Sequence, residues 1–295
     1  MSVFDTIVSR ESVARGWSAD RKYKARTADG KTYFLRISPR EQYENRKLQF
    51  RHMELVRDLG VRVCGPVEFG SCPEGCYMIL EWVAGRDAEA VLPGLSGQEQ
   101  YRCGLEAGRM LRTIHRIRVP FETAPWGERY GKKLDKKLEA YRKSPLKFEK
   151  GALYLELLKR ERHLAEGRPT VWCHGDFHCG NLMFDEQMHL TVIDFDREDI
   201  SDPWYEFNRI IWDVRMGAMF ASGMVDGYFD GEVPAEFWPM MRLYQAQNMI
   251  SSLPWSLDFG ETEIRMALEN GEMVLQWYDD LRKVVPNWYT AGSVR

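Results

Sequence analysis

Strand-forming segments are concentrated in the N-terminal third of this chain, and helix-forming segments follow them. The segment KYKARTADGKTYFLRIS has β-forming residues on both sides of Asp29 and Gly30, a pair that tolerates the positive φ angles of a tight hairpin turn. The apolar runs VCGPVEFG and CYMILEWV are also typical of strands. A doubly wound α/β domain would alternate strands and helices throughout, so this order predicts an α+β architecture instead.

One helix is predicted within the strand-rich part, over SPREQYENRKLQFRHMELVRDLG. Ser38 can act as its N-cap, Glu41 completes a capping box, and Gly60 can end the helix. The following segment, VAGRDAEAVLPGLSG, is rich in turn residues and predicts a junction. We therefore expect an N-terminal domain of residues 1–84 and a mainly helical C-terminal domain of residues 85–295.

A short β-rich patch interrupts the helical part of the chain. It comprises TVWC, NLMF and HLTVIDF, and the turn DEQ joins the last two segments as a hairpin. Beyond Pro203 the pattern is helical, with expected breaks at Pro234, Pro239, Pro254 and Pro286. The sequence thus predicts a small sheet inserted between helices.

Composition narrows the class of protein. The 295 residues are 44% apolar and 29% charged, which is typical of a globular protein, and the net charge of −3 argues against nucleic acid as a partner. The N-terminus resembles no signal peptide, and no apolar run approaches the ~18–20 residues of a membrane span. We expect a cytoplasmic monomer or homodimer without a membrane partner, and read its six cysteines as reduced thiols.

The segment CHGDFHCGNLMF is the densest cluster of polar residues in the sequence. Cys173, His174, His178 and Cys179 are all possible zinc ligands by type. Their spacing is poor for zinc, because one short loop cannot easily wrap four adjacent ligands around a tetrahedral ion. A zinc-binding structural protein remains an alternative that metal analysis would test.

The carboxylates and the amide of this region suggest a different chemistry. Asp176 lies five residues before Asn181, and Asp194 ends the strand thirteen residues after Asn181. Phosphoryl transfer from a nucleotide needs a carboxylate to orient the acceptor hydroxyl, and oxygen ligands to hold Mg²⁺. A hairpin can bring Asn181 and Asp194 to one end of the small sheet. Taken one at a time, Asp176, Asn181 and Asp194 could instead serve only as turn or cap residues.

The pattern HGDFHCGNLMF followed by VIDFD resembles the catalytic loop and metal-binding strand of the aminoglycoside phosphotransferase family. The resemblance implies a protein-kinase-like two-lobe fold of the α+β class, with a β-rich N-lobe, a mainly helical C-lobe and a small inserted catalytic hairpin. It also implies ATP, or GTP, as phosphoryl donor and Mg²⁺ as cofactor. Asp176 would be the catalytic base, and Asn181 and Asp194 the Mg²⁺ ligands.

The resemblance extends to the N-terminal nucleotide site. A basic residue on the third strand should reach the phosphates, and Arg36 in YFLRIS stands where the family usually has lysine. Its acidic partner should come early in the next helix. Glu44 is the expected partner and Glu41 its rival, because Glu41 already serves the predicted capping box.

Further family positions can be assigned in the same way. The segment ARGWSADRKYKA lies where the phosphate-covering loop belongs, and Ser18 is its expected phosphate contact. In LEWVAG, Glu81 and Val83 are the expected backbone contacts of the nucleotide base. Asp202, in SDPWYEFNRI, is expected to brace the catalytic loop.

The expected acceptor is a small molecule that carries an amine. Residues 201–295 hold 7 basic and 14 acidic residues, and aromatic side chains accompany the acids. Acids attract ammonium groups and aromatic faces bind cations, which suits an aminoglycoside-like antibiotic or an amino alcohol, and hence a role in antibiotic resistance. Alternatives are a metabolic kinase for choline, homoserine or a sugar, and a kinase-like binding protein without activity. The expected acids include Glu206, Asp213, Asp226, Asp230, Glu232 and Asp258.

Overall fold

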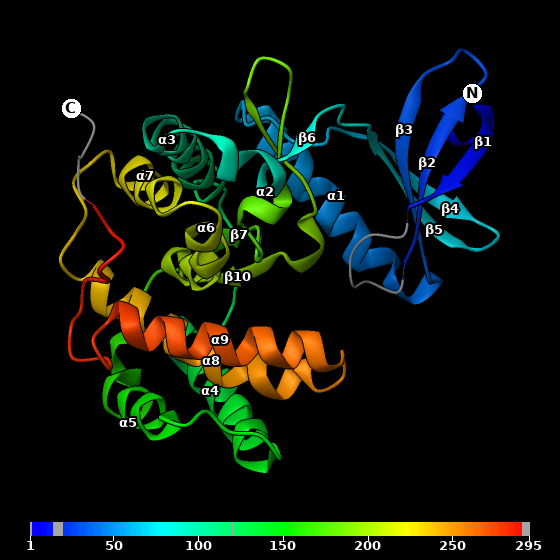
Figure 1. The fold of residues 1–295 in the computed structure, drawn as a ribbon. Coiled ribbons are helices and arrows are strands. Elements are labelled where there is room, and N and C mark those ends of the chain that lie inside the picture. The colour runs from blue at the N-terminus through cyan, green and yellow to red at the C-terminus, as the bar shows by residue number, and fades with distance from the viewer. Residues whose placement is uncertain (1, 14–19, 120, 291–295) are drawn as a thin grey trace. The chain divides into compact units, whose positions relative to one another are not determined.

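The chain forms two compact units in a computed structural model, which describes residues 2–13, 20–119 and 121–290 (Figure 1). The first unit comprises Met1–Val91 and Asn181–Glu198, and the second comprises Leu92–Gly180 and Asp199–Arg295. The sequence placed a domain boundary after residue 84. In the structure, the first unit runs a little further and also takes in a segment from the middle of the chain. Each unit is described by itself.

A five-stranded antiparallel sheet forms the centre of the first unit, in the order β1-β2-β3-β5-β4. Its strands are β1 (Ile7–Ser12), β2 (Arg21–Thr27), β3 (Thr32–Ser38), β4 (Pro66–Cys72) and β5 (Gly75–Glu81). The turn between β2 and β3 contains Gly30 at φ +84°, which confirms the predicted hairpin. One face of the sheet packs an apolar cluster that includes Ala25, Leu35 and Ile79.

The helix of the first unit, α1 (Tyr43–Asp58), begins later than predicted. Ser38 is the last residue of β3, and a short 3-10 turn, Arg40–Gln42, separates it from α1. The Ser38 hydroxyl instead accepts a hydrogen bond from Nε of Arg46 at 3.1 Å. The predicted capping box was therefore wrong, because Ser38 is held in the strand and cannot reach the first turn.

A small three-stranded sheet completes the first unit, in the order β6-β8-β9. Its strands are β6 (Arg86–Asp87), β8 (Leu182–Phe184) and β9 (Leu190–Val192), and α2 (Ala88–Val91) follows β6. The β8–β9 hairpin confirms the prediction from NLMF and HLTVIDF. The Cys64 backbone N–H donates to the Val192 carbonyl at 3.1 Å, which fastens the hairpin to the chain just before β4.

The second unit is mainly helical. It contains α3 (Gly97–Ile114), α4 (Trp126–Lys143), α5 (Gly151–Glu161), α6 (Ile210–Met216), α7 (Ala218–Phe229), α8 (Phe237–Ser256) and α9 (Glu261–Trp277). The TVWC segment forms β7 (Val171–Cys173), which pairs with β10 (Asp199–Ser201). The sequence grouped TVWC with the hairpin strands, and that grouping was wrong because β10 is too short to give a strand pattern of its own.

Helices α3 and α7 approach each other closely through glycines. A Cβ atom at Gly104 or Gly108 of α3 would lie 2.1 Å from a backbone carbonyl oxygen of α7. Gly223 and Gly227 of α7 face α3 with similarly short distances, 2.2 and 2.3 Å. Any larger side chain at these positions would force the two helices apart. This contact fixes the C-terminal end of α3, which carries a histidine of the site described below.

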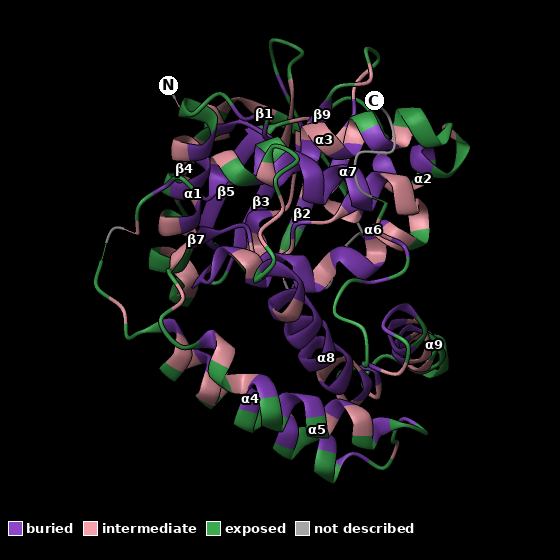
Figure 2. Ribbon diagram, turned by 90° about the vertical axis from the view of Figure 1, so that its left-hand side faces the viewer, coloured by how far each residue is buried: buried purple, intermediate pink, exposed green. Residues whose placement is uncertain are grey.

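Helix α8 is buried along most of its length (Figure 2). It contains Pro239 in its first turn and Pro254 near its C-terminal end, so the breaks expected at these prolines were wrong. A proline in the first turn costs little, because the N–H it lacks would have no helical partner there. Among the helices that the structure describes, none combines the length and the apolar character needed to cross a membrane.

Candidate active site

Asp176 lies in the loop after β7, and a buried carboxylate fixes the backbone of that loop. The N–H groups of Gly175 and Phe177 donate to the two carboxylate oxygens of Glu206, at 3.1 and 3.0 Å. Glu206 belongs to the 3-10 helix Pro203–Arg209 and is only 2% exposed. The two-pronged contact therefore holds the residues on both sides of Asp176.

The charge of Glu206 is stabilised from several directions. Burial by itself raises the pKa of this carboxyl, but the neighbouring side chains of His115 and His174 and the Phe177 N–H lower the pKa to about 2. His115 ends α3, and its Nε2 lies 3.6 Å from Glu206 while its Nδ1 lies 2.9 Å from the Tyr228 hydroxyl. The close packing of α3 on α7 thus supports Glu206, which holds the loop that carries Asp176.

Replacing Glu206 by glutamine is expected to lower the free energy of unfolding at pH 7 by about 3 kcal/mol, the equivalent of the shift in pKa from 4.5 to about 2. A carboxyl group whose pKa is lowered by folding stabilises the fold at pH values above its ordinary pKa. This contribution is lost as the pH falls from about 4.5 toward 2. The difference in unfolding free energy between wild type and variant should therefore shrink to less than half at pH 3. Urea titrations at both pH values measure it.

The exposed Glu232 provides the control, since Glu232→Gln should change the unfolding free energy little at either pH. A Glu206→Gln variant whose destabilisation is the same at pH 7 and pH 3 would contradict the role assigned to the Glu206 charge.

The side chain of Asp176 has two basic residues as neighbours. Nε of Arg209 lies 3.0 Å from Oδ1 of Asp176, and Nε2 of His178 lies 3.8 Å from the same oxygen. Asp213 of α6 accepts the backbone N–H of Cys179 at 2.7 Å. Arg209 directly precedes α6. Residues of one short segment therefore contact both the Asp176 carboxylate and the end of the loop that carries it.

Residues other than the predicted Asp202 brace the loop that carries Asp176. His174 is fully buried, and its Nδ1 accepts the Asp176 backbone N–H at 3.3 Å. Asp202 instead binds Arg168 through two hydrogen bonds, at 2.8 and 2.9 Å, and accepts the Tyr244 hydroxyl. The assignment of the brace to Asp202 was wrong, because the 3-10 helix carries Glu206, four residues later, to the loop backbone.

The cysteine and histidine side chains near the loop have hydrogen-bonding partners. His115, Cys173 and Glu206 bring possible metal-ligand atoms within 4.8 Å of one another. However, Cys173 Sγ lies 3.2 Å from the Ser201 hydroxyl, and Glu206 and His115 have the partners described above. All six cysteines are free thiols, as predicted. A hydrogen-bonded core therefore accounts for these side chains.

In the first unit, the β8–β9 hairpin brings the two predicted metal ligands to one end. The Asn181 carbonyl accepts the backbone N–H of Ile193 at 3.0 Å, and Asp194 follows directly. Asp194 adopts a left-handed conformation, with φ 59°, and its Oδ1 is a buried oxygen without a hydrogen bond. A carboxylate oxygen that accepts no hydrogen bond, although the Arg36 guanidinium lies 3.5 Å away, stands here beside an amide residue, and oxygen ligands of this kind suit a hard cation such as Mg²⁺, so these residues fit the implied metal.

Arg36 is surrounded by carboxylates rather than by one acid. It is 5% exposed, and its guanidinium lies 3.0 Å from Asp196, 3.5 Å from Asp20 and 3.5 Å from Asp194. The sequence pointed to Arg36 as a phosphate ligand but gave no sign of this acidic cluster. Two of its members flank Phe195 in the motif VIDFD, and the third precedes β2.

Glu44, the expected partner of Arg36, is exposed in the first turn of α1 and forms no ion pair within the described residues. The helix instead directs a cation, Arg46, toward Asp20 at 2.7 Å and toward Asp196. The expected Arg36–Glu44 pair is therefore not formed. A sequence pattern could not have shown this, because the order of charges along α1 does not reveal which of them faces the sheet.

The segment expected to contact the nucleotide base follows β5. The Glu81 backbone N–H donates to the Gly65 carbonyl at 2.8 Å, so this group is already engaged. The backbone groups of Val83 make no hydrogen bond within the part of the chain that the structure describes, and Val83 stays the predicted contact. Ser18, the expected phosphate contact, lies outside the described residues.

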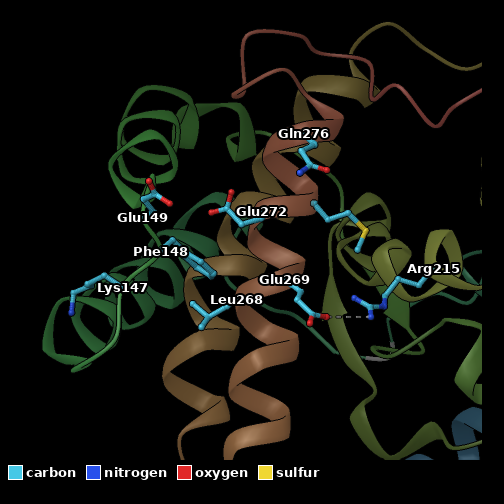
Figure 3. Close-up of a pocket in the computed structure, with 9 residues that line it drawn as sticks. Lys147, Phe148, Glu149, Arg215, Leu268, Glu269, Glu272 and Gln276 are labelled. Carbon is cyan, nitrogen blue, oxygen red and sulfur yellow. Dashed lines mark ion pairs between the residues drawn. The ribbon is translucent and has the colours of Figure 1, made fainter.

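The second unit contains a pocket of about 710 Å³ between α9, α6 and the segment before α5 (Figure 3). Its lining residues are Lys147, Phe148, Glu149, Arg215, Leu268, Glu269, Glu272, Met273 and Gln276. Arg215 forms an ion pair with Glu269 at 3.7 Å and donates to Asn270 at 2.7 Å. The pocket thus combines carboxylates with apolar side chains.

The charge of this pocket is negative in balance. The Lys147 ammonium group is tied to the Ser144 carbonyl, and Glu269 is paired with Arg215. Glu149 and Glu272 form no ion pair among the described residues. Two carboxylates are therefore available to a positively charged molecule.

Three acids that the sequence suggested for acceptor binding are buried instead. Glu206 and Asp213 hold the loop that carries Asp176, and Asp226 accepts the hydroxyl groups of Tyr101 and Tyr289, both at 2.6 Å. Their assignment to the acceptor was wrong, because composition cannot separate a buried structural carboxylate from an exposed one.

Comparisons with known proteins show the family of this chain. Residues 9–238 match the model of the phosphotransferase enzyme family. A protein of Enterococcus faecium, named as a probable ketoamine kinase, is 26% identical over 219 residues, which cover 70% of this chain and 74% of that protein.

Two solved structures show the same fold. The GDP complex of aminoglycoside 2'-phosphotransferase-IIIa has a TM-score of 0.66 at 20% identity, covering 91% of this chain and 92% of the other. A spectinomycin phosphotransferase, in complex with ADP and spectinomycin, has a TM-score of 0.61 at 15% identity, covering 90% and 89%. The predicted protein-kinase-like α+β fold is thereby confirmed. This chain belongs to the phosphotransferase enzyme family and is a small-molecule kinase.

Proposed function

We propose that the protein transfers the γ-phosphoryl group of ATP to a hydroxyl group of a small molecule that carries an amine. The observation that carries this proposal is that residues at the two ends of α6 contact Asp176 and line the acidic pocket. Arg209, just before the helix, contacts Asp176, and Arg215, near its end, lines the acidic pocket. Six residues of helix span roughly 9 Å, which is within the length of a small acceptor.

The residues of the second unit suit the chemistry at the acceptor. Asp176 would orient the acceptor hydroxyl and take its proton as the bond from the hydroxyl oxygen to the γ-phosphorus forms. The bond from that phosphorus to the β–γ bridging oxygen breaks, and ADP leaves. Arg209 and the Glu206 anchor hold the Asp176 carboxylate in one orientation, and such positioning lowers the barrier.

The residues of the first unit suit the nucleotide and its metal. Mg²⁺, when bound, would neutralise charge on the phosphates, and Asn181 and Asp194 are the residues that would hold it. Val83 offers backbone groups to the base. GTP is the alternative donor, since one structural neighbour was solved with ADP and another with GDP.

The pocket supports an amine-bearing acceptor because Glu149 and Glu272 can pair with ammonium groups. An aminoglycoside-like antibiotic or an amino alcohol meets this requirement, and an antibiotic acceptor would make the protein a resistance factor. A ketoamine also carries an amine, and the 26% identity to the Enterococcus faecium protein favours its inclusion among the candidates.

A phosphorylation screen tests the proposed function. ATP and Mg²⁺ are incubated with aminoglycosides, choline and other amino alcohols, homoserine, simple sugars and ketoamines, and ADP release and product mass are measured. Asp176→Ala serves as the blank. Turnover of an amine-bearing acceptor by the wild type alone is expected. Turnover of neutral sugars only would contradict the amine requirement, and nucleotide binding without turnover of any acceptor would favour a binding protein.

The double substitution Glu149→Gln and Glu272→Gln is expected to raise KM for an amine-bearing acceptor about tenfold or more, since each lost charge-assisted contact is worth about 1.5–3 kcal/mol when well formed. The KM for ATP should not change. Steady-state kinetics with each substrate varied in turn measure both values.

Glu156→Gln is the matched control, because Glu156 is exposed on α5 and does not line the pocket. An unchanged acceptor KM in the double variant would move the acceptor site away from this pocket.

A further inference from the structure

A group of basic side chains lies in the second unit, around Tyr205. Lys133 and Lys137 are one turn apart on α4, so both extend from the same side of this helix. Nζ of Lys133 lies 3.3 Å from Oδ2 of Asp199 and 4.6 Å from the centre of the Tyr205 ring. The Lys133 side chain is 37% exposed, so a small molecule can reach this group from outside. Lys133, Lys137, Tyr205 and Arg209 are called the basic cluster below.

One cation of the basic cluster has no carboxylate partner. Arg209 and Lys133 are each paired with an aspartate, at 3.0 and 3.3 Å. The Lys137 ammonium group donates to the Ser251 hydroxyl at 3.2 Å, and it forms no ion pair within the described residues. The basic cluster therefore has an excess of positive charge, which belongs to Lys137.

The Tyr205 hydroxyl group is within the electrostatic reach of all three cations. Burial raises the pKa of Tyr205, but the three positive charges lower this pKa below its ordinary value. Burial lowers the pKa of Lys137, and the charges of Lys133 and Arg209 lower it as well. A partly buried cation among like charges is unfavourable, and an anion beside Lys137 would relieve the repulsion.

The basic cluster also offers a hydrogen-bond donor that is not used. The Tyr205 hydroxyl donates to Oε1 of Gln247 at 3.0 Å, which places the Gln247 amide beside the cluster. Gln247 is fully buried, and its Nε2 donates no hydrogen bond within the part of the chain that the structure describes. Excess positive charge together with an unused donor suits an anion with several acceptor oxygens, such as a carboxylate or a phosphate.

The basic cluster adjoins the proposed base, because Arg209 contacts Asp176. We propose that Lys137, together with Lys133, binds an anionic group of the acceptor, a carboxylate or a phosphate. This inference rests on the proposed function and narrows its acceptor to molecules that carry both an amine and an anion. Arg209 and Arg215, which lines the acidic pocket, are separated by roughly 9 Å of helix. The acceptor should therefore be an extended molecule whose two charged groups lie well apart.

Three ketoamines that share the same amine but differ in their anion test this inference. The first is formed from glucose and 6-aminohexanoate, the second from glucose and pentylamine, and the third from glucose 6-phosphate and pentylamine. Steady-state kinetics with ATP and Mg²⁺ give KM for each ketoamine and for any acceptor that the phosphorylation screen identifies. Wild type should have a KM about tenfold or more lower for a ketoamine with an anion than for the second one. Preference for the first ketoamine would identify a carboxylate, and preference for the third a phosphate.

Variants of α4 assign the preference to Lys137. Lys137→Gln keeps a donor for Ser251 but removes the charge, and it should raise KM for the preferred ketoamine about tenfold, toward the KM of the second ketoamine. Lys137→Arg keeps the charge and should retain most of the preference. Lys136→Gln is the matched control, since Lys136 is exposed on the same helix, and it should behave as wild type does. The KM for ATP should be the same in all variants.

Several results would overturn the inference while leaving the proposed function intact. Wild type could have equal KM values for the three ketoamines, or turn over only acceptors without an anion. Lys137→Gln could keep the wild-type preference, or raise KM equally for all three ketoamines, which would indicate a structural role. A raised KM for ATP in this variant would assign the cation to the phosphoryl donor. A wild-type protein that turns over no acceptor at all would instead contradict the proposed function.

Discussion

Asp176→Asn is expected to lower kcat by a factor of about 10³ or more while the Kd for ATP stays within about twofold. Asparagine keeps the shape of the side chain and can still contact Arg209, but it cannot accept the proton of the acceptor hydroxyl. The loop itself should persist, because its backbone is held by Glu206 and Asp213 rather than by the replaced carboxylate. Single-turnover kinetics and nucleotide titration measure the two quantities separately.

The control for this substitution is Asp135→Asn. Asp135 is an exposed aspartate of α4 that pairs with Arg162, and its replacement should leave kcat unchanged. A loss of only about tenfold in Asp176→Asn would show that another group accepts the proton. A parallel loss of ATP affinity would show that the substitution disturbs more than the transfer step.

Asp194→Asn is expected to abolish most Mg²⁺-dependent turnover, with kcat/KM for ATP reduced by about 10³. The conformation at this position is left-handed, with φ 59°, and asparagine tolerates that region as well as aspartate does. The backbone should therefore be preserved, and the substitution removes one negative charge at Oδ1, the oxygen that lies 3.5 Å from the Arg36 guanidinium. When turnover is measured as a function of Mg²⁺ concentration, the variant should need a higher Mg²⁺ concentration than wild type to reach half-maximal turnover.

The same hairpin provides a control at its other end. Asp185 accepts the backbone N–H groups of Gln187 and His189 in the turn, and an asparagine oxygen can accept both. Asp185→Asn should therefore keep wild-type turnover and the wild-type Mg²⁺ requirement. If Asp194→Asn did the same, Asp194 could not be a ligand of the metal used in catalysis.

Features that depend on neighbouring residues were predictable from the sequence. The Asp29-Gly30 turn and the β8–β9 hairpin follow from local preference and alternation, and the structure confirms them. The motif HGDFHCGN with VIDFD also identified the family, because its spacing is fixed by a single loop and hairpin. In each of these cases the interacting groups are close in sequence, so a short stretch of chain contains the whole signal.

Features that depend on distant partners were not predictable. The two-residue strand β6 and the three-residue strand β10 exist only because β8 and β7 offer them edges. Ser38 became a strand end because β3 continues along β5. In each case hydrogen bonding to a neighbouring strand decided the local structure, because the conformational preference of the segment itself was weak.

The sequence by itself determined the family, the order of strands and helices, and the residues of the motif, because these are properties of short segments. Only the tertiary structure decided which charges meet. It placed Glu206 rather than Asp202 against the loop that carries Asp176, Arg46 rather than Glu44 beside the acids around Arg36, and Lys22 opposite Arg36. Electrostatic interactions act through space between groups far apart in the chain. The type of a charged residue in the sequence does not reveal whether its side chain is buried, paired or exposed.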